Sequence, residues 1–201
     1  MTPRELADSL RAELEEHLQA VRHIADMIEA MGAKDAPVPP YHSQWEKDAQ
    51  RFSGDCGPAC LAMLIEWRTG LPVSVDQLSV ECNMTVSRNT TTASDLLRVA
   101  QTHGLSLMQR TVAGVDAITF PSIVLVHYED LPRLDTKYLR GHWVVVLSVE
   151  NGQVTYHDPD YWGADMDRGA SRQVPLRIFD QAMYNCKKDG NPPGLTLGVA
   201  R

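Results

Sequence analysis

Apolar residues recur every three or four positions between residues 3 and 31, with charged residues between them. The apolar positions are Leu6, Leu10, Leu14, Leu18, Val21, Ile24, Ile28 and Met31. This period predicts an amphipathic helix of roughly 40 Å. Gly32 ends the pattern, and the prolines of Ala36-Pro37-Val38-Pro39-Pro40 cannot continue a helix. We therefore expect two parts, an N-terminal helix over residues 1–35 and a domain over residues 36–201.

The first half of the larger part carries helical patterns. Residues 55–68 combine apolar positions with Asp55 as a candidate N-cap, Pro58 in the first turn and Gly70 just beyond the end. Two shorter helices are predicted over residues 75–81 and 92–100, the second opening with the capping-box sequence Thr92-Ala-Ser-Asp95 and stopping at Gly104.

The second half changes to the composition of β-strands. Runs rich in valine, isoleucine and tyrosine occupy residues 122–127, 142–149 and 154–156. Glu150-Asn151-Gly152-Gln153 joins the last two runs like a hairpin turn. Further strand candidates are residues 174–178 and 195–199. Helices that precede strands are typical of an α+β fold with segregated layers.

The composition is that of an ordinary globular protein, with 43% apolar and 22% charged residues. The formal net charge of -7 and the lack of a Lys/Arg run argue against a nucleic-acid partner. The longest apolar run, residues 143–147, is far below the roughly 20 residues that span a bilayer. The charged N-terminus lacks the apolar stretch of a secretory signal. We expect a cytoplasmic protein without a membrane segment.

Cys56 lies at the start of the helix predicted over residues 55–68. A cysteine attacks as its thiolate, and the unpaired N–H groups of a helix N-terminus favour negative charge. Gly57 adds no side-chain bulk beside the sulfur, so a substrate acyl group could approach closely. Most isolated cysteines are small buried core residues, so a nucleophile hypothesis depends on partners elsewhere in the chain.

A general base for this cysteine should come from a rigid element in another part of the chain. His142 begins an apolar strand, and Asp158 follows the next strand across the hairpin, so the two could be cross-strand neighbours. By accepting the second ring N–H, Asp158 would fix the tautomer and orientation of the imidazole. A glutamine upstream of Cys56, either Gln44 or Gln50, would donate to the oxyanion together with the Cys56 backbone N–H.

Four segments in order carry a resemblance to a known family. They are Tyr41-His-Ser-Gln-Trp45, Gly54-Asp-Cys-Gly-Pro-Ala-Cys-Leu-Ala-Met63, Gly141-His-Trp-Val-Val-Val146 and His157-Asp-Pro159. Together, within roughly residues 38–185, they resemble the bacteriocin-processing cysteine peptidases and their stand-alone relatives in the papain-like clan. The resemblance implies a papain-like fold with Cys56 as nucleophile, His142 as base and Asp158 as orienting residue. Gln50 has the papain-like spacing, whereas Gln44 has the Ser-Gln-Trp context of the stand-alone relatives.

The resemblance also implies a peptide or protein substrate, a thioester acyl-enzyme, and no metal or organic cofactor. Bacteriocin-processing members are typically fused to a membrane transporter and cut leader peptides after paired glycines, and this chain carries no such transporter. The N-terminal helix is not part of the family pattern. It could pack against its own domain or form a homo-oligomer, and both alternatives stay open.

Three rival interpretations remain. The same triad could perform another acyl transfer, such as deamidation, isopeptide cleavage or peptide ligation. A binding module could keep the fold and lack turnover. A zinc site could form from Cys56 and Cys60 with His142, His157 or Asp158, although structural zinc sites usually pair cysteines through a loop rather than within a helix.

Overall fold

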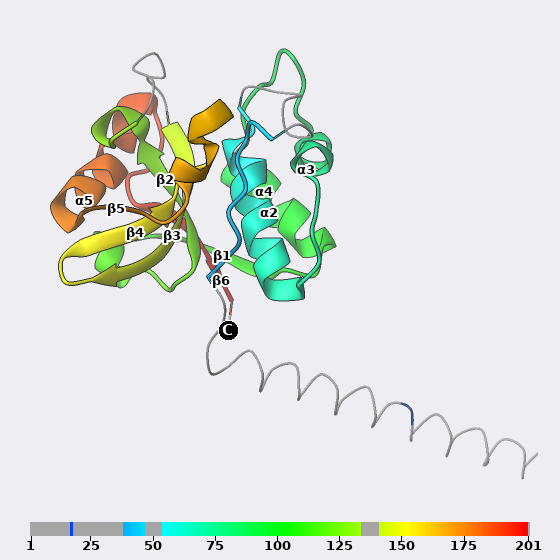
Figure 1. Ribbon diagram of the computed structural model, residues 1–201, viewed down its shortest axis with the longest axis horizontal. Helices are drawn as coiled ribbons and strands as arrows, with labels where there is room; N and C mark the ends of the chain where they lie inside the picture. The colour runs from blue at the N-terminus through cyan, green and yellow to red at the C-terminus, as the bar shows by residue number, and fades with distance from the viewer. Residues whose placement is uncertain (1–16, 18–37, 47–53, 134–140, 201) are drawn as a thin grey trace, which may run out of the picture. The chain divides into compact units, whose positions relative to one another are not determined.

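The computed structural model describes residue 17 and residues 38–46, 54–133 and 141–200. His17 is helical, and the remainder of the helix predicted over residues 3–31 lies outside the described residues. The chain from Pro39 onward forms one compact unit (Figure 1). None of the described helices combines the length and the apolar character that crossing a membrane requires.

The described part of this unit holds four α-helices and one six-stranded antiparallel sheet. The helices are α2 (Cys56–Thr69), α3 (Val75–Glu81), α4 (Ala93–Thr102) and α5 (Leu176–Asn185). The strands are β1 (Leu107–Thr111), β2 (Ser122–His127), β3 (Gly141–Glu150), β4 (Gln153–His157), β5 (Arg172–Pro175) and β6 (Leu195–Val199). Their order in the sheet is β1-β6-β2-β3-β4-β5. The expected α+β class is confirmed.

Both faces of the central strands are covered. Every residue of β2 is buried, which explains why this strand reads as a continuous apolar run rather than an alternating one. Ile123 and Leu125 belong to the core cluster that includes α2, α3 and α4. Val124 and Val126 belong to the cluster that includes α5. Figure 1 shows α2, α3 and α4 grouped together and α5 apart from them, across β2, β3 and β4.

The start of α2 differs from its prediction in one respect. Asp55 occupies the N-cap position, but its side chain makes no capping hydrogen bond. The buried carboxylate instead accepts a hydrogen bond from Ser79 Oγ at 3.0 Å, which ties the start of α2 to α3. Gly70 ends α2 in the left-handed conformation, as expected. The capping box Thr92-Ala-Ser-Asp95 is also confirmed at the start of α4.

The strands confirm most of the second-half prediction. The hairpin between β3 and β4 turns at Asn151 and Gly152, both with positive φ. The strand expected over residues 174–178 is wrong beyond Pro175, because α5 begins at the next residue. Helices therefore do not all precede the strands.

Candidate active site

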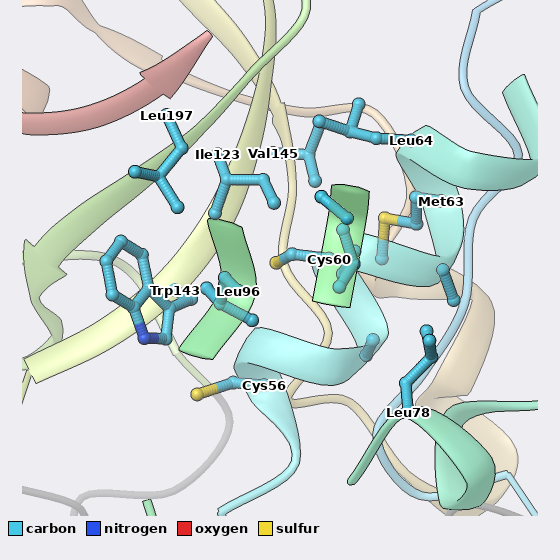
Figure 2. Close-up of a cluster of buried hydrophobic side chains, with 14 of the residues drawn as sticks. Cys56, Cys60, Met63, Leu64, Leu78, Leu96, Ile123, Trp143, Val145 and Leu197 are labelled. Atoms are coloured by element: carbon cyan, nitrogen blue, oxygen red, sulfur yellow. The ribbon is translucent and has the colours of Figure 1, made fainter. Parts of the chain in front are cut away.

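Cys56 is the first residue of α2, and its sulfur lies at the edge of the core. Figure 2 shows this sulfur pointing away from the cluster, whereas the Cys60 sulfur lies among the buried side chains. Cys56 is 9% exposed and Cys60 is fully buried. The Cys56 thiol also lies 3.9 Å from the Gly54 carbonyl oxygen, which is a weak acceptor at this distance. The sulfur thus lies at a helix N-terminus, where unpaired N–H groups favour negative charge.

His142 and Asp158 are joined by a buried hydrogen bond. The distance from His142 Nε2 to Asp158 Oδ1 is 2.9 Å, and both residues are inaccessible to solvent. The register of β3 and β4 pairs Val145 with His157, so Asp158, just past β4, lies opposite Val144. The carboxylate therefore reaches His142 diagonally along one face of the sheet. The two residues are diagonal neighbours rather than directly opposite.

His142 also interacts with Cys56. Burial disfavours the charged imidazole, but hydrogen bonds to Asp158 and Cys56, together with their charges, raise the pKa of His142 to about 10. Because Nε2 faces Asp158, Nδ1 is the ring nitrogen left for the sulfur. A histidine with this pKa is protonated at neutral pH, so a cation lies beside the Cys56 sulfur. The structure thus brings together side chains from α2, β3 and the end of β4.

The Asp158 carboxylate is surrounded by donors. Besides His142, its Oδ1 accepts the backbone N–H of Asp160 at 3.1 Å. The Tyr128 hydroxyl lies 3.3 Å from Oδ2, and the Tyr41 hydroxyl donates to the Asp158 backbone carbonyl at 3.0 Å. A buried carboxylate needs such donors, since it is shielded from water. The contacts hold Asp158 in one orientation.

The Gln44 side chain is buried beside the loop that carries Asp158. Its amide nitrogen donates to Asp160 Oδ1 at 3.1 Å. The same carboxylate oxygen accepts the indole N–H of Trp45 at 2.7 Å. Burial raises the pKa of Asp160 above its ordinary range. The other candidate for the oxyanion hole, Gln50, lies outside the described residues.

Three residues that contact the His142–Asp158 pair were not predicted from the sequence. They are Tyr41, Tyr128 and Asp160. Asp160 had a signal, because it lies two residues after Asp158 in Asp-Pro-Asp and a short loop returns such a backbone N–H to the first carboxylate. Tyr41 begins the segment Tyr41-His-Ser-Gln-Trp45 that carries the resemblance, although nothing in that segment predicts a contact with Asp158. Tyr128 had no local signal, since it comes from a segment distant in sequence.

Gly57, the residue after Cys56, has a different role from the one predicted. A Cβ at Gly57 would lie 2.1 Å from Thr91 Oγ1 and 3.2 Å from Trp143 Cδ1. The indole N–H of Trp143 in turn donates to the Thr91 backbone carbonyl at 3.3 Å. The space beside Gly57 at the start of α2 is therefore filled by Thr91 and Trp143. Gly57 is needed for close packing rather than for opening a path to the sulfur.

The zinc interpretation finds no support in the positions of its ligands. His157 accepts the Ser171 backbone N–H at Nδ1 and donates from Nε2 to the Pro39 carbonyl, so both ring nitrogens are engaged away from His142. Burial raises the pKa of Cys60 well above its ordinary value, which disfavours the thiolate that binds zinc. Within residues 38–46, 54–133 and 141–200, no three His, Cys, Asp or Glu side chains group as metal ligands.

Comparison with known proteins gives a family match and several similar structures. The model of the peptidase C39 family matches residues 46–172, which is more than half of the chain. A double-glycine-motif protease from an AMS/PCAT transporter, crystallised with the leader peptide, is 20% identical with a TM-score of 0.56. The similarity covers 82% of this chain and 91% of that one.

Two further structures share the fold. A C39-like peptidase from Bacillus anthracis is 14% identical with a TM-score of 0.56, covering 81% of this chain and 94% of that one. The peptidase domain of Streptococcus ComA, a bifunctional ABC transporter involved in quorum sensing, is 23% identical with a TM-score of 0.50. It covers 75% of this chain and 94% of its own. At these identities the structures establish the fold alone. Among proteins with curated functions, none matches this chain.

Proposed function

Since the chain belongs to the peptidase C39 family, we propose that it is a cysteine peptidase with Cys56 as nucleophile, His142 as general base and Asp158 as orienting residue. The observation that carries the proposal is the position of the His142 ring. One ring nitrogen is hydrogen-bonded to the Asp158 carboxylate, and the ring also interacts with the Cys56 thiol. A fold alone does not imply function, so this arrangement supports catalysis more strongly than the family match does.

The reaction begins with a thiolate–imidazolium pair. The Cys56 sulfur attacks the carbonyl carbon of the scissile peptide bond, and the carbonyl oxygen becomes an oxyanion. His142 donates its proton to the departing amide nitrogen, the C–N bond breaks, and a thioester remains on Cys56. His142 then removes a proton from water, whose oxygen attacks the thioester. The C–S bond breaks, the acid product leaves, and the thiolate–imidazolium pair is restored.

The oxyanion would be stabilised by the Cys56 backbone N–H and a glutamine amide. Gln44 is supported by its burial and by the hydrogen bond that fixes its amide nitrogen to Asp160. Gln50 is supported by its papain-like spacing from Cys56. Both remain candidates for the same role.

We propose a peptide or protein substrate, supported by the leader peptide bound to the structurally similar double-glycine-motif protease. We further propose a reducing, cytoplasmic location. All four cysteines are free thiols, as expected in that compartment.

Selective alkylation tests the proposal, and the chain supplies its own control thiols. Cys60, Cys82 and Cys186 are fully buried, and burial raises the pKa of the last two to about 12. Iodoacetamide at pH 7 should therefore modify Cys56 first, as read by peptide mass spectrometry. His142→Ala should abolish that selectivity. Alkylation of wild-type Cys56 no faster than a model thiol would instead indicate a binding module.

Other acyl transfer on the same triad is the remaining alternative within enzymes. A panel of peptides incubated with and without competing amines separates hydrolysis from acyl transfer to an amine. Hydrolysis yields only the free acid, whereas a transferase yields amide products in proportion to the added amine.

A further inference from the structure

Tyr128 covers one face of the His142 ring. The two ring centroids lie 4.1 Å apart with an interplanar angle of 27°, which is a stacked arrangement. Tyr128 opens the short 3₁₀ turn Tyr128–Asp130, directly after β2. The register of β2 and β3 pairs Val126 with His142, so the turn brings the tyrosine ring back over the imidazole. Tyr128 is only 1% exposed, and its position is therefore set by packing.

The hydroxyl of the same tyrosine reaches the orienting carboxylate. It lies 3.3 Å from Asp158 Oδ2 and 3.5 Å from Oδ1. Burial and the negative charge of Asp158 raise the pKa of Tyr128 far above its ordinary value. The phenol therefore keeps its proton and acts as a donor throughout the working pH range. One side chain contacts both His142 and Asp158.

We infer that Tyr128 is a positioning residue for this site, with its ring fixing the plane of His142 and its hydroxyl fixing the Asp158 carboxylate. The inference rests on the proposed function, which makes His142 the base. The χ2 torsion of histidine is broad, so an unsupported ring could turn Nδ1 away from the sulfur. A flat partner against the ring removes that freedom, and preorganisation of this kind lowers the barrier to reaction.

The ring also affects the charge of His142. A protonated imidazole against the face of a tyrosine is attracted by the negative face of the aromatic ring. The other groups that face His142 are Cys56 from α2 and, from the loop after β4, Asp158 and Asp160. The Arg133 guanidinium lies over the Tyr128 ring, 5.8 Å from the ring centroid. The stack therefore acts in the same direction as the surrounding acidic groups and favours the imidazolium.

Two substitutions separate the ring from the hydroxyl. Tyr128→Leu removes the stack but keeps an apolar side chain of moderate size, and Tyr128→Phe removes only the hydroxyl. Phe179→Leu is the matched control, because Phe179 is a fully buried aromatic in the same core cluster and is not among the partners of His142. If Tyr128→Leu does not fold, Tyr128→Met replaces it, since methionine fills irregular space.

The measurement is an NMR titration of the His142 ring in the full chain, with the signal assigned by His142→Gln. In Tyr128→Leu the midpoint should fall by about one pH unit, because the stack and the alignment with Asp158 are lost together. Tyr128→Phe and Phe179→Leu should keep the wild-type midpoint. Tyr128→Phe should slow peptide cleavage by about threefold, since one donor to Asp158 is removed.

An unchanged midpoint in Tyr128→Leu would overturn the inference, as would an equal fall in Phe179→Leu. Failure of the proposed function looks different, because the titration does not require turnover. In that case Cys56 alkylates no faster than a model thiol, although Tyr128→Leu still lowers the midpoint of the His142 titration. If Cys56 is reactive and the His142 midpoint is unchanged in Tyr128→Leu, the role of Tyr128 is rejected and the proposed function stands.

Discussion

At the scale of single residues, the polar groups of the site depend on one another. The His142 ring and the Asp158 carboxylate are both buried, where an isolated charge is strongly unfavourable. Each is tolerated because the imidazolium and the carboxylate supply each other with a hydrogen bond and an opposite charge. Removal of either His142 or Asp158 therefore leaves the other buried without its partner. This lowers the free energy of unfolding more than replacement of both residues by apolar ones.

The raised pKa of His142 predicts how stability changes with pH. Its folded-state pKa is about 10 against an ordinary value of 6.5, so folding favours the protonated form. The resulting stabilisation is fully present below about pH 6.5 and is lost as the pH rises to about 10. In urea unfolding, the free energy of unfolding of wild type relative to His142→Gln should fall by roughly 3–5 kcal/mol across this window. A constant difference would contradict a charged His142 in the folded protein.

The two glutamine candidates predict different kinetic outcomes. Loss of the oxyanion donor should lower kcat for peptide cleavage by about 10²–10³. It should leave the alkylation of Cys56 by iodoacetamide unchanged, because alkylation forms no oxyanion. Comparing Gln44→Ala with Gln50→Ala in both assays therefore identifies the donor. A wild-type kcat in both variants would mean that neither glutamine stabilises the oxyanion.

At the scale of secondary-structure elements, the start of α2 packs tightly against the segment before α4. The Gly54 backbone N–H donates to Asn89 Oδ1 at 3.1 Å, and a Cβ at Gly54 would lie 2.1 Å from the Asn89 carbonyl oxygen. The same closeness recurs between Gly57 and Thr91. Gly54 and Gly57, on either side of Cys56, thus let the segment before α4 pack directly against the start of α2.

Gly57→Ala tests this packing. The new methyl would overlap Thr91 Oγ1, so we expect a loss of about 1–3 kcal/mol in the free energy of unfolding. Thr91 Oγ1 is buried and has no hydrogen-bond partner in the part of the chain that the structure describes. Thr91→Ala alone should therefore cost little, and the double variant should recover most of the lost stability. Denaturant unfolding measures all three, and no recovery in the double variant would refute the steric explanation.

Elements with strong local signals were predicted from the sequence, and elements decided by packing were not. The capping box of α4 and the turn at Asn151 and Gly152 are examples of local signals that fix an element. β1 was missed because residues 107–111 contain little of the β-branched and aromatic composition of strands. The first residues of α5 were included in the strand predicted over residues 174–178, where Val174, Leu176 and Ile178 alternate with other residues, whereas burial of a helical face decides the structure of α5.

The site divides in the same way. Cys56, His142 and Asp158 were identified by motifs and by the resemblance they carry, and the structure brings them together. Tyr128 could not be identified, because its stacking on His142 depends on the register of β2 against β3 and on the turn that follows. The sequence does not specify a register so far from its turn.

At the scale of the whole molecule, the segment at residues 39–46 connects the two halves of the fold. On one side, His42 Nε2 lies 2.8 Å from Glu66 Oε2 on α2. On the other, the Ser43 hydroxyl donates to the Tyr161 carbonyl at 2.6 Å in the loop after β4. The Pro39 carbonyl accepts from His157 at 2.8 Å. These contacts make residues 39–46 part of the peptidase unit.

A variant that lacks residues 1–37 should therefore fold as one cooperative unit and alkylate Cys56 at the full-length rate. The compact unit begins at Pro39, and the Pro39 carbonyl already accepts a hydrogen bond from His157 beside the site. Two uses are open for the apolar stripe from Leu6 to Met31, packing against its own domain and self-association. If it mediates self-association, sedimentation should show a larger species for the full chain than for the variant. Equal monomeric masses, with reduced stability in the variant, would show instead that the stripe packs against its own domain.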